Sequence, residues 1–152
     1  MSTSPTAILQ LIDTERDALR AFIVLLEREQ HVLLSSDTDP LLELAKQKMH
    51  LAETLATSVR QRQTLFPAAT AAIEPWLHQN APTALTAWQD LRQLAAHAGQ
   101  LNRSNGELIQ IGQRYNQQAL QALISASQHA AGLYGPNGQP CTPGSGRTLG
   151  SG

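Results

Sequence analysis

Apolar residues recur at steps of three or four, or multiples of these, along the N-terminal part of the chain, which is the spacing of one helix face. Ser4 can cap this helix, and Pro5 suits its first turn, where a missing N–H loses no helical partner. Glu15 and Glu29 occupy two places that the apolar series skips. The pattern predicts a coiled-coil-like helix over 5–34, about 45 Å long. Its apolar positions are Ile8, Ile12, Leu19, Phe22, Leu26 and Leu33.

The same signals predict a second helix over 39–65. It begins at Asp39-Pro40, a second cap-plus-proline start, and Pro67 disfavours helical geometry at the residue before it. Because the connection between the first two helices is short, we expect them to pack antiparallel. Three prolines then bracket a short helical linker over 68–79, whose Trp76 is expected to close one end of the bundle.

The longest helical stretch is predicted over 83–131. At roughly 75 Å it would extend well beyond the first helix. Ser104 and Glu107 have the spacing of a capping box, so one helix could end near Asn102 and another begin. A continuous helix would instead tolerate Gly106 at a cost of about 1 kcal/mol relative to alanine. We favour the continuous helix, since the apolar period persists on both sides.

From Gly132 onward the chain is rich in Gly, Pro and Ser, which predicts a flexible tail over 132–152. Leu, Ala and Gln dominate the rest, and unbranched side chains of this kind favour helices. We therefore predict an all-α helical domain over 1–131. It would consist of an antiparallel helical hairpin plus a long third helix, forming an elongated coiled-coil-like bundle.

Charge and composition narrow the classes of partner. The net charge is −1, and without a basic stripe nucleic acid is not expected to bind. No apolar run is long enough for membrane insertion, and the N-terminus lacks the features of a signal peptide. The single cysteine, Cys141, cannot form an internal disulfide and is expected to have an incidental role in the tail. These features predict a cytoplasmic protein.

No catalytic or cofactor site is predicted. The five histidines are scattered, and only His50 and Glu53 share a helix face, whereas zinc needs three or four converging ligands. A metal-binding four-helix bundle would need inward Glu and His pairs on two helices, so this alternative is weak. No serine has the surroundings of a nucleophile elbow, and no phosphate-binding loop follows a strand. We expect no enzymatic activity, no metal and no cofactor.

The charged residues of the first helix are expected to lie on a solvated face, where opposite charges three or four residues apart pair weakly. This expectation covers Glu15 and Arg16, Glu27 and Arg28, and the run of Asp13, Asp17 and Arg20.

Two features exceed the needs of a simple bundle. The third helix is apolar on more than one face, so its overhanging half should bind a helix of a partner chain, while 85–101 packs within the bundle. The second feature is Leu133-Tyr134-Gly135, which suits a short linear anchor because tyrosine buries a large area at little entropic cost. The alternative for Tyr134 is a helix cap folded onto the last turn.

With these features the chain resembles the FlgN-type flagellar export chaperones. The likeness is carried by 42–48 (LELAKQK), 101–109 (LNRSNGELI), 116–120 (NQQAL) and 133–139 (LYGPNGQ), and the tail beyond Gln139 departs from it. It implies a helical chaperone that binds the C-terminal helices of hook–filament junction (hook-associated) proteins. Such a chaperone prevents their premature assembly and delivers them to the export gate of the type III secretion machinery.

The resemblance also implies site residues. Leu133, Tyr134 and Gly135 would dock on the cytoplasmic domain of the export gate, and we hypothesise that Tyr134 is partly masked until cargo binds. The cargo-binding face would consist of Leu108, Ile109, Ile111, Tyr115, Leu120, Leu123 and Ile124.

Two further possibilities remain at this stage. A coiled-coil adaptor or regulatory protein unrelated to flagellar export would use the same overhanging helix. In the absence of cargo, a homodimer could cover the apolar surface of that helix.

Overall fold

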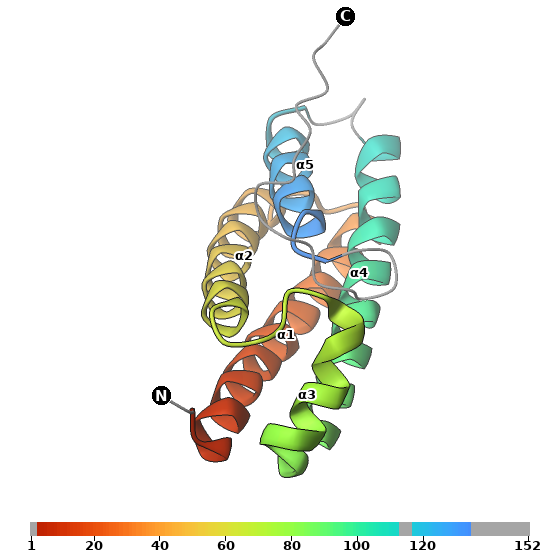
Figure 1. Ribbon diagram of the computed structural model, residues 1–152. Coiled ribbons are helices and arrows are strands. Elements are labelled where there is room, and N and C mark those ends of the chain that lie inside the picture. The colour runs from red at the N-terminus through yellow and green to blue at the C-terminus, as the bar shows by residue number, and fades with distance from the viewer. Residues whose placement is uncertain (1–2, 113–116, 135–152) are drawn as a thin grey trace, which may run out of the picture.

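The computed structural model describes residues 3–112 and 117–134 (Figure 1). These residues form helices and no β-strand, which confirms the all-α prediction. Two single 3₁₀ turns, Thr70–Ala72 and Pro82–Ala84, lie before and after the short third helix. The α-helices are α1 (Pro5–Leu34), α2 (Leu41–Gln63), α3 (Ile73–Asn80), α4 (Leu85–Gly112) and α5 (Gln117–Ala131).

The four longer helices pack as a ring. α1 contacts α2 and α4, and α5 contacts the same two helices from the opposite side (Figure 1). α1 and α2 form an antiparallel hairpin, and α4 and α5 form a second one, so α1 and α4 point the same way. The core therefore lies between two hairpins, with α5 facing α1 across it.

α1 has the bounds that its apolar series predicts. The Ala7 N–H donates to Ser4 Oγ at 3.1 Å, so the predicted cap forms, and Pro5 occupies the first turn. The apolar positions Ile8, Ile12 and Leu19 are fully buried, as expected for the core-facing side of an amphipathic helix.

The long helix predicted over 83–131 is instead two helices. α4 continues through Gly106, so that reading of the capping-box segment is right, but α4 ends at Gly112 and α5 packs back against α2 and α4. The prediction that the third helix extends well beyond α1 is therefore wrong. The physical reason is burial, since the apolar face of α5 is removed from water within this chain, worth roughly 25 cal/mol per Å². Its buried apolar residues are Leu120, Leu123, Ala126 and Ala130.

α3 covers the end of the bundle where α1 begins (Figure 1). Ile73 and Leu77 point into the core, and the half-buried Trp76 packs on it. The Trp76 ring lies 4.9 Å from that of Phe66, which in turn lies 5.6 Å from Trp88. The linker helix and its tryptophan thus add an aromatic layer to this end of the core.

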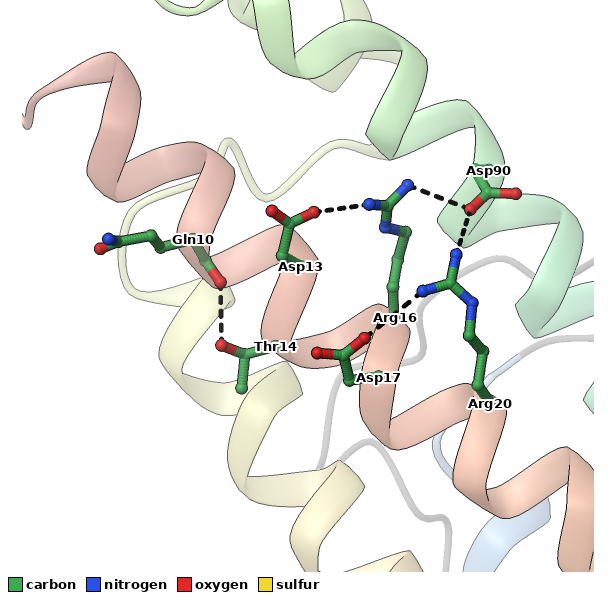
Figure 2. A network of polar contacts seen from close by, with 7 residues as sticks. All are labelled: Gln10, Asp13, Thr14, Arg16, Asp17, Arg20 and Asp90. Atoms are coloured by element: carbon green, nitrogen blue, oxygen red, sulfur yellow. Dashed lines mark hydrogen bonds and ion pairs between the residues drawn. The ribbon is translucent and has the colours of Figure 1, made fainter.

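Charged residues on the outer side of α1 reach across to α4 (Figure 2). Arg16 bonds Asp13 at 2.7 Å and Asp90 at 3.1 Å, and Arg20 bonds Asp17 at 3.4 Å and Asp90 at 3.2 Å. These side chains are partly to largely exposed, as predicted for them, so each pair contributes little to stability.

Gly106 offers a direct test of the continuous α4. A Cβ atom built at this position meets no heavy atom within 4 Å. Alanine lowers the backbone entropy of the unfolded chain, so Gly106→Ala should stabilise the protein by about 0.5–1 kcal/mol. Urea denaturation would measure the gain, and Gly99→Ala, at an equally open helical site, is the matched variant. A loss of stability in Gly106→Ala alone would indicate that the helix breaks there.

Candidate functional site

The predicted cargo-binding residues are divided between two helices. Leu108, Ile109 and Ile111 lie near the end of α4, and Leu120, Leu123 and Ile124 lie on α5. Three of them, Ile109, Leu120 and Leu123, are buried within this chain, and Tyr115 lies outside the described residues. Only Ile111 is largely exposed, at 71% of its surface. The six described residues therefore do not form one open face.

An open apolar groove lies where α1 ends and α2 begins. It has a volume of about 430 Å³ and includes Leu108 and Leu120 of the predicted set. Exposed leucines at the same helix ends, Leu34 and Leu42, and Ile111 of α4 extend the apolar character around it. This end of the bundle is therefore suited to contact an apolar partner. The remaining lining residues are Leu33, Ser35, Ser36, Thr38, Leu41 and Gly112.

A buried polar layer crosses the bundle next to this groove. Lys48 of α2 is fully buried, and its Nζ donates to Glu29 Oε1 of α1 at 3.0 Å and to Ser127 Oγ of α5 at 2.6 Å. Asn102 of α4 donates from Nδ2 to the backbone oxygen of Ser127 at 3.0 Å. Asn105 donates to Glu29 Oε1 at 2.9 Å. All four long helices thus meet at one set of hydrogen bonds.

Burial controls the electrostatics of this layer. Removal from water lowers the pKa of Lys48, and the neighbouring Glu29 carboxylate opposes that shift. A buried ion pair of this kind gives little net stability, but removing one partner leaves an uncompensated charge. Lys48 therefore needs acceptor atoms on both sides, and α5 supplies one of them.

A second buried layer holds the tail tyrosine. Glu15 and Arg62 pair through two hydrogen bonds of 2.7 and 3.0 Å, and both side chains are buried. The Arg62 guanidinium lies 5.0 Å from the centre of the Trp88 ring, within the range of cation–π attraction. The Tyr134 hydroxyl donates to Glu15 Oε1 at 3.2 Å. The end of α5 is thereby tied to α1.

The tyrosine is neutral in this setting. Burial, and after it the charge of Glu15, raises the pKa of Tyr134 well above its ordinary value. The side chain is half-buried and packs against the core beside the buried Leu133. Tyr134 therefore reaches across to α1 rather than folding only onto the last turn of its own helix, and Gly135 lies outside the described residues. A pocket of about 210 Å³, lined by Tyr134, Phe22 and Leu55 among others, adjoins it.

The expected exposure of Glu15 is wrong. Glu15 is fully buried because it occupies a core-facing position of the α1 series and finds Arg62 opposite it. Sequence reasoning missed Lys48 and Arg62 altogether as partners. A signal was present: Glu15 and Glu29 are fourteen residues apart, and so are Lys48 and Arg62. Equal spacing on two antiparallel helices brings both pairs into register.

His50 and Glu53 are exposed on α2, and the described residues contain no group of three or more His, Cys, Asp or Glu that could hold a metal ion. None of the described helices has the length and apolar content to cross a membrane. Cys141 lies outside the described residues.

The Glu15–Arg62 pair can be tested by a double-mutant cycle. Arg62→Leu leaves the Glu15 carboxylate buried and unpaired, so it should cost about 3–5 kcal/mol in the free energy of unfolding. The double variant Glu15→Leu/Arg62→Leu should recover most of that loss, because both charges are gone. Urea denaturation measures both effects. Arg92→Gln, which breaks a partly exposed pair with Glu74, is the control and should change stability by less than about 0.5 kcal/mol. A double variant as unstable as Arg62→Leu alone would contradict this account.

Comparisons with known proteins identify the family. The family model described as FlgN protein matches residues 1–142, which include both polar layers, the apolar groove and Tyr134. Searches of curated proteins and of solved structures found no match. The family match agrees with the resemblance noted in 42–48, 101–109, 116–120 and 133–139. The chain therefore belongs to the FlgN family of flagellar export chaperones.

Proposed function

We propose that this chain is a cytoplasmic chaperone that binds the C-terminal helices of hook–filament junction subunits. It keeps these subunits from assembling early and delivers them to the export gate of the flagellar type III machinery. The FlgN match over residues 1–142 carries this proposal. The open apolar groove at one end of the bundle supports it, since exported coiled-coil ends are amphipathic helices that need a temporary packing surface.

The groove supplies the first contact for cargo. Leu108 is half-buried at its edge, Leu120 forms part of its floor, and Ile111 stands exposed on the last turn of α4. An apolar helix face placed here would bury Ile111 without moving the core. Ile109 and Leu123 of the predicted set are buried in the core and do not line this groove.

Tyr134, with Leu133 and Gly135, is the proposed contact for the export gate. The Tyr134 hydroxyl is held by Glu15, and Leu133 is buried, so the motif is not presented while α5 is docked. Gate docking then requires the tyrosine to leave Glu15. This arrangement supports the hypothesis that Tyr134 is masked in the free chaperone and is released by cargo.

The cargo surface can be tested at Ile111. Ile111→Asp places a charge where an apolar helix should dock, so cargo affinity should fall by about tenfold or more, the equivalent of 1.4 kcal/mol. Isothermal titration with a peptide of a junction subunit's C-terminal helix measures this. Val24→Asp, at an equally exposed β-branched residue of α1, is the matched control and should leave affinity unchanged. Equal loss in both variants, or in neither, would exclude Ile111 from the cargo contact.

Leu123→Asp would not separate a loss of cargo binding from a loss of folding. Leu123 is fully buried in α5, so an aspartate there disrupts packing whether or not cargo contacts it.

Gate docking can be tested at Tyr134. Tyr134→Ala should retain cargo binding and lose binding to the cytoplasmic domain of the gate, measured by co-sedimentation or titration with the purified domain. Tyr134→Phe is the matched control, because it keeps the ring but loses the hydrogen bond to Glu15. We expect Tyr134→Phe to bind the gate more readily than the native chain when cargo is absent. If the native chain binds the gate equally with and without cargo, the masking hypothesis fails.

A further inference from the structure

α5 has the properties of a helix bound in a groove. Its described buried residues follow one another at steps of three or one along a single face: Leu120, Leu123, Ala126, Ser127 and Ala130. That face packs against α2 and α4 and shares two apolar clusters with residues of α1, and we call the surface that receives it the trough. Helix-in-groove recognition between separate chains uses the same spacing of anchors. The trough therefore already shows what kind of helix it accepts.

The trough also has a polar requirement. Lys48 and Asn102 both donate hydrogen bonds to Ser127, to its Oγ and to its backbone oxygen. If α5 departs, the Lys48 ammonium keeps Glu29 but loses its second acceptor. Leaving a buried charged donor unsatisfied is costly, so any helix that replaces α5 must bring an acceptor to this point.

α5 satisfies this layer incompletely. Glu29 Oε2, Asn102 Oδ1 and Asn105 Oδ1 are buried and have no hydrogen-bond partner among the described residues. Each is an acceptor, and the serine hydroxyl has only one proton to offer. A side-chain amide carries an acceptor oxygen together with two N–H donors. Asn or Gln at the place of Ser127 would thus serve Lys48 and also offer a donor to the unpaired oxygens.

We infer that α5 is an internal occupant of the cargo site, and that cargo replaces it with an amphipathic helix whose apolar stripe is interrupted once by an asparagine or glutamine opposite Lys48. This inference rests on the proposed chaperone function and specifies its site and the chemistry of its partner. The open groove at Leu33, Leu41 and Leu108 also includes Leu120, a buried residue of α5, so an incoming helix gains contacts there before α5 has left.

The same exchange accounts for release of the docking motif. Tyr134 follows the end of α5 by three residues, and its hydroxyl bonds Glu15 while Leu133 beside it packs in the core. Removal of α5 from the trough withdraws the hydroxyl from Glu15, while the Glu15–Arg62 pair stays in place between α1 and α2. Cargo binding and exposure of the tyrosine are then a single event.

Hydrogen exchange of the unmodified chain provides the first test. If α5 opens as a unit, its amides from 120 to 131 should exchange at least about tenfold faster than the core amides of α1 and α4, through a sub-global opening. If the amides of α5 and α1 exchange at the same rate, α5 opens only when the whole protein unfolds. That result would overturn the inference. This measurement needs no variant and so carries no risk of misfolding.

Peptides added to the full-length chain test the partner chemistry. The probe is a blocked peptide of residues 117–134, QQALQALISASQHAAGLY, and its partner carries Ser127→Gln. The glutamine peptide should bind about tenfold more tightly than the serine peptide, for one additional satisfied buried group. Binding should remove the protection of the chain's own α5 amides while those of α1 persist. The control peptide, Leu123→Asp, should not bind. Binding without loss of α5 protection, or equal affinity of the two peptides, would overturn the inference.

Competition separates this inference from the proposed function. Junction-subunit helices that bind and displace the glutamine peptide support both. Helices that bind without displacing it leave the chaperone function standing and place cargo elsewhere. Binding of the peptide but not of any junction helix removes the proposed cargo and, with it, the assignment of the trough. Light scattering would also detect dimers that form at higher concentration by exchanging α5 between two copies. In that case a second copy of the chain occupies the trough, and the cargo assignment is overturned.

Discussion

Two buried acid–base pairs set the register of the α1–α2 hairpin, and the remaining structure is built on that hairpin. Glu15 faces Arg62 and Glu29 faces Lys48, with all four side chains buried. Because the two pairs are two heptads apart on both helices, a slide of one helix by a single turn breaks both at once. An apolar seam of leucines and alanines alone would tolerate such a slide far better. The charges thus select one alignment of two otherwise repetitive helices.

The sequence contains the residues of both buried pairs, but apolar periodicity alone does not show that they pair. The apolar series of α1 correctly located the core-facing side, and it marked Glu15 and Glu29 as interruptions. A charged residue in such a position is usually placed on the surface, because burial of one charge alone is very costly. Only the matching separation of Lys48 and Arg62 on the next helix shows that each glutamate has a partner. The all-α class, α1 and the continuity of α4 through Gly106 follow from local signals.

The return of α5 could not be predicted in this way. The apolar period continues from α4 into α5, and residues 113–116 contain no proline to mark an end. Whether such a segment extends or folds back depends on the surface that awaits it, namely the trough between α2 and α4. That surface exists only after α1 and α2 have aligned, so the position of α5 is a consequence of long-range packing. For the same reason Ile109, Leu120 and Leu123, which we expected on an open face, are buried within this chain.

The polar floor of the trough also reconciles two demands on a chaperone of this family. A protein with an empty apolar trough would tend to aggregate through that surface. If a tightly packed apolar helix filled the trough, cargo could not displace it easily. In this chain α5 covers the apolar surface, but at its centre it leaves three buried oxygens without a partner among the described residues. Buried polar groups without a partner cost free energy in the closed state. On the inference drawn above, such an occupant covers the trough and can still be exchanged for cargo. The hydroxyl of Tyr134 would then change its surroundings with that exchange, because it follows the same helix.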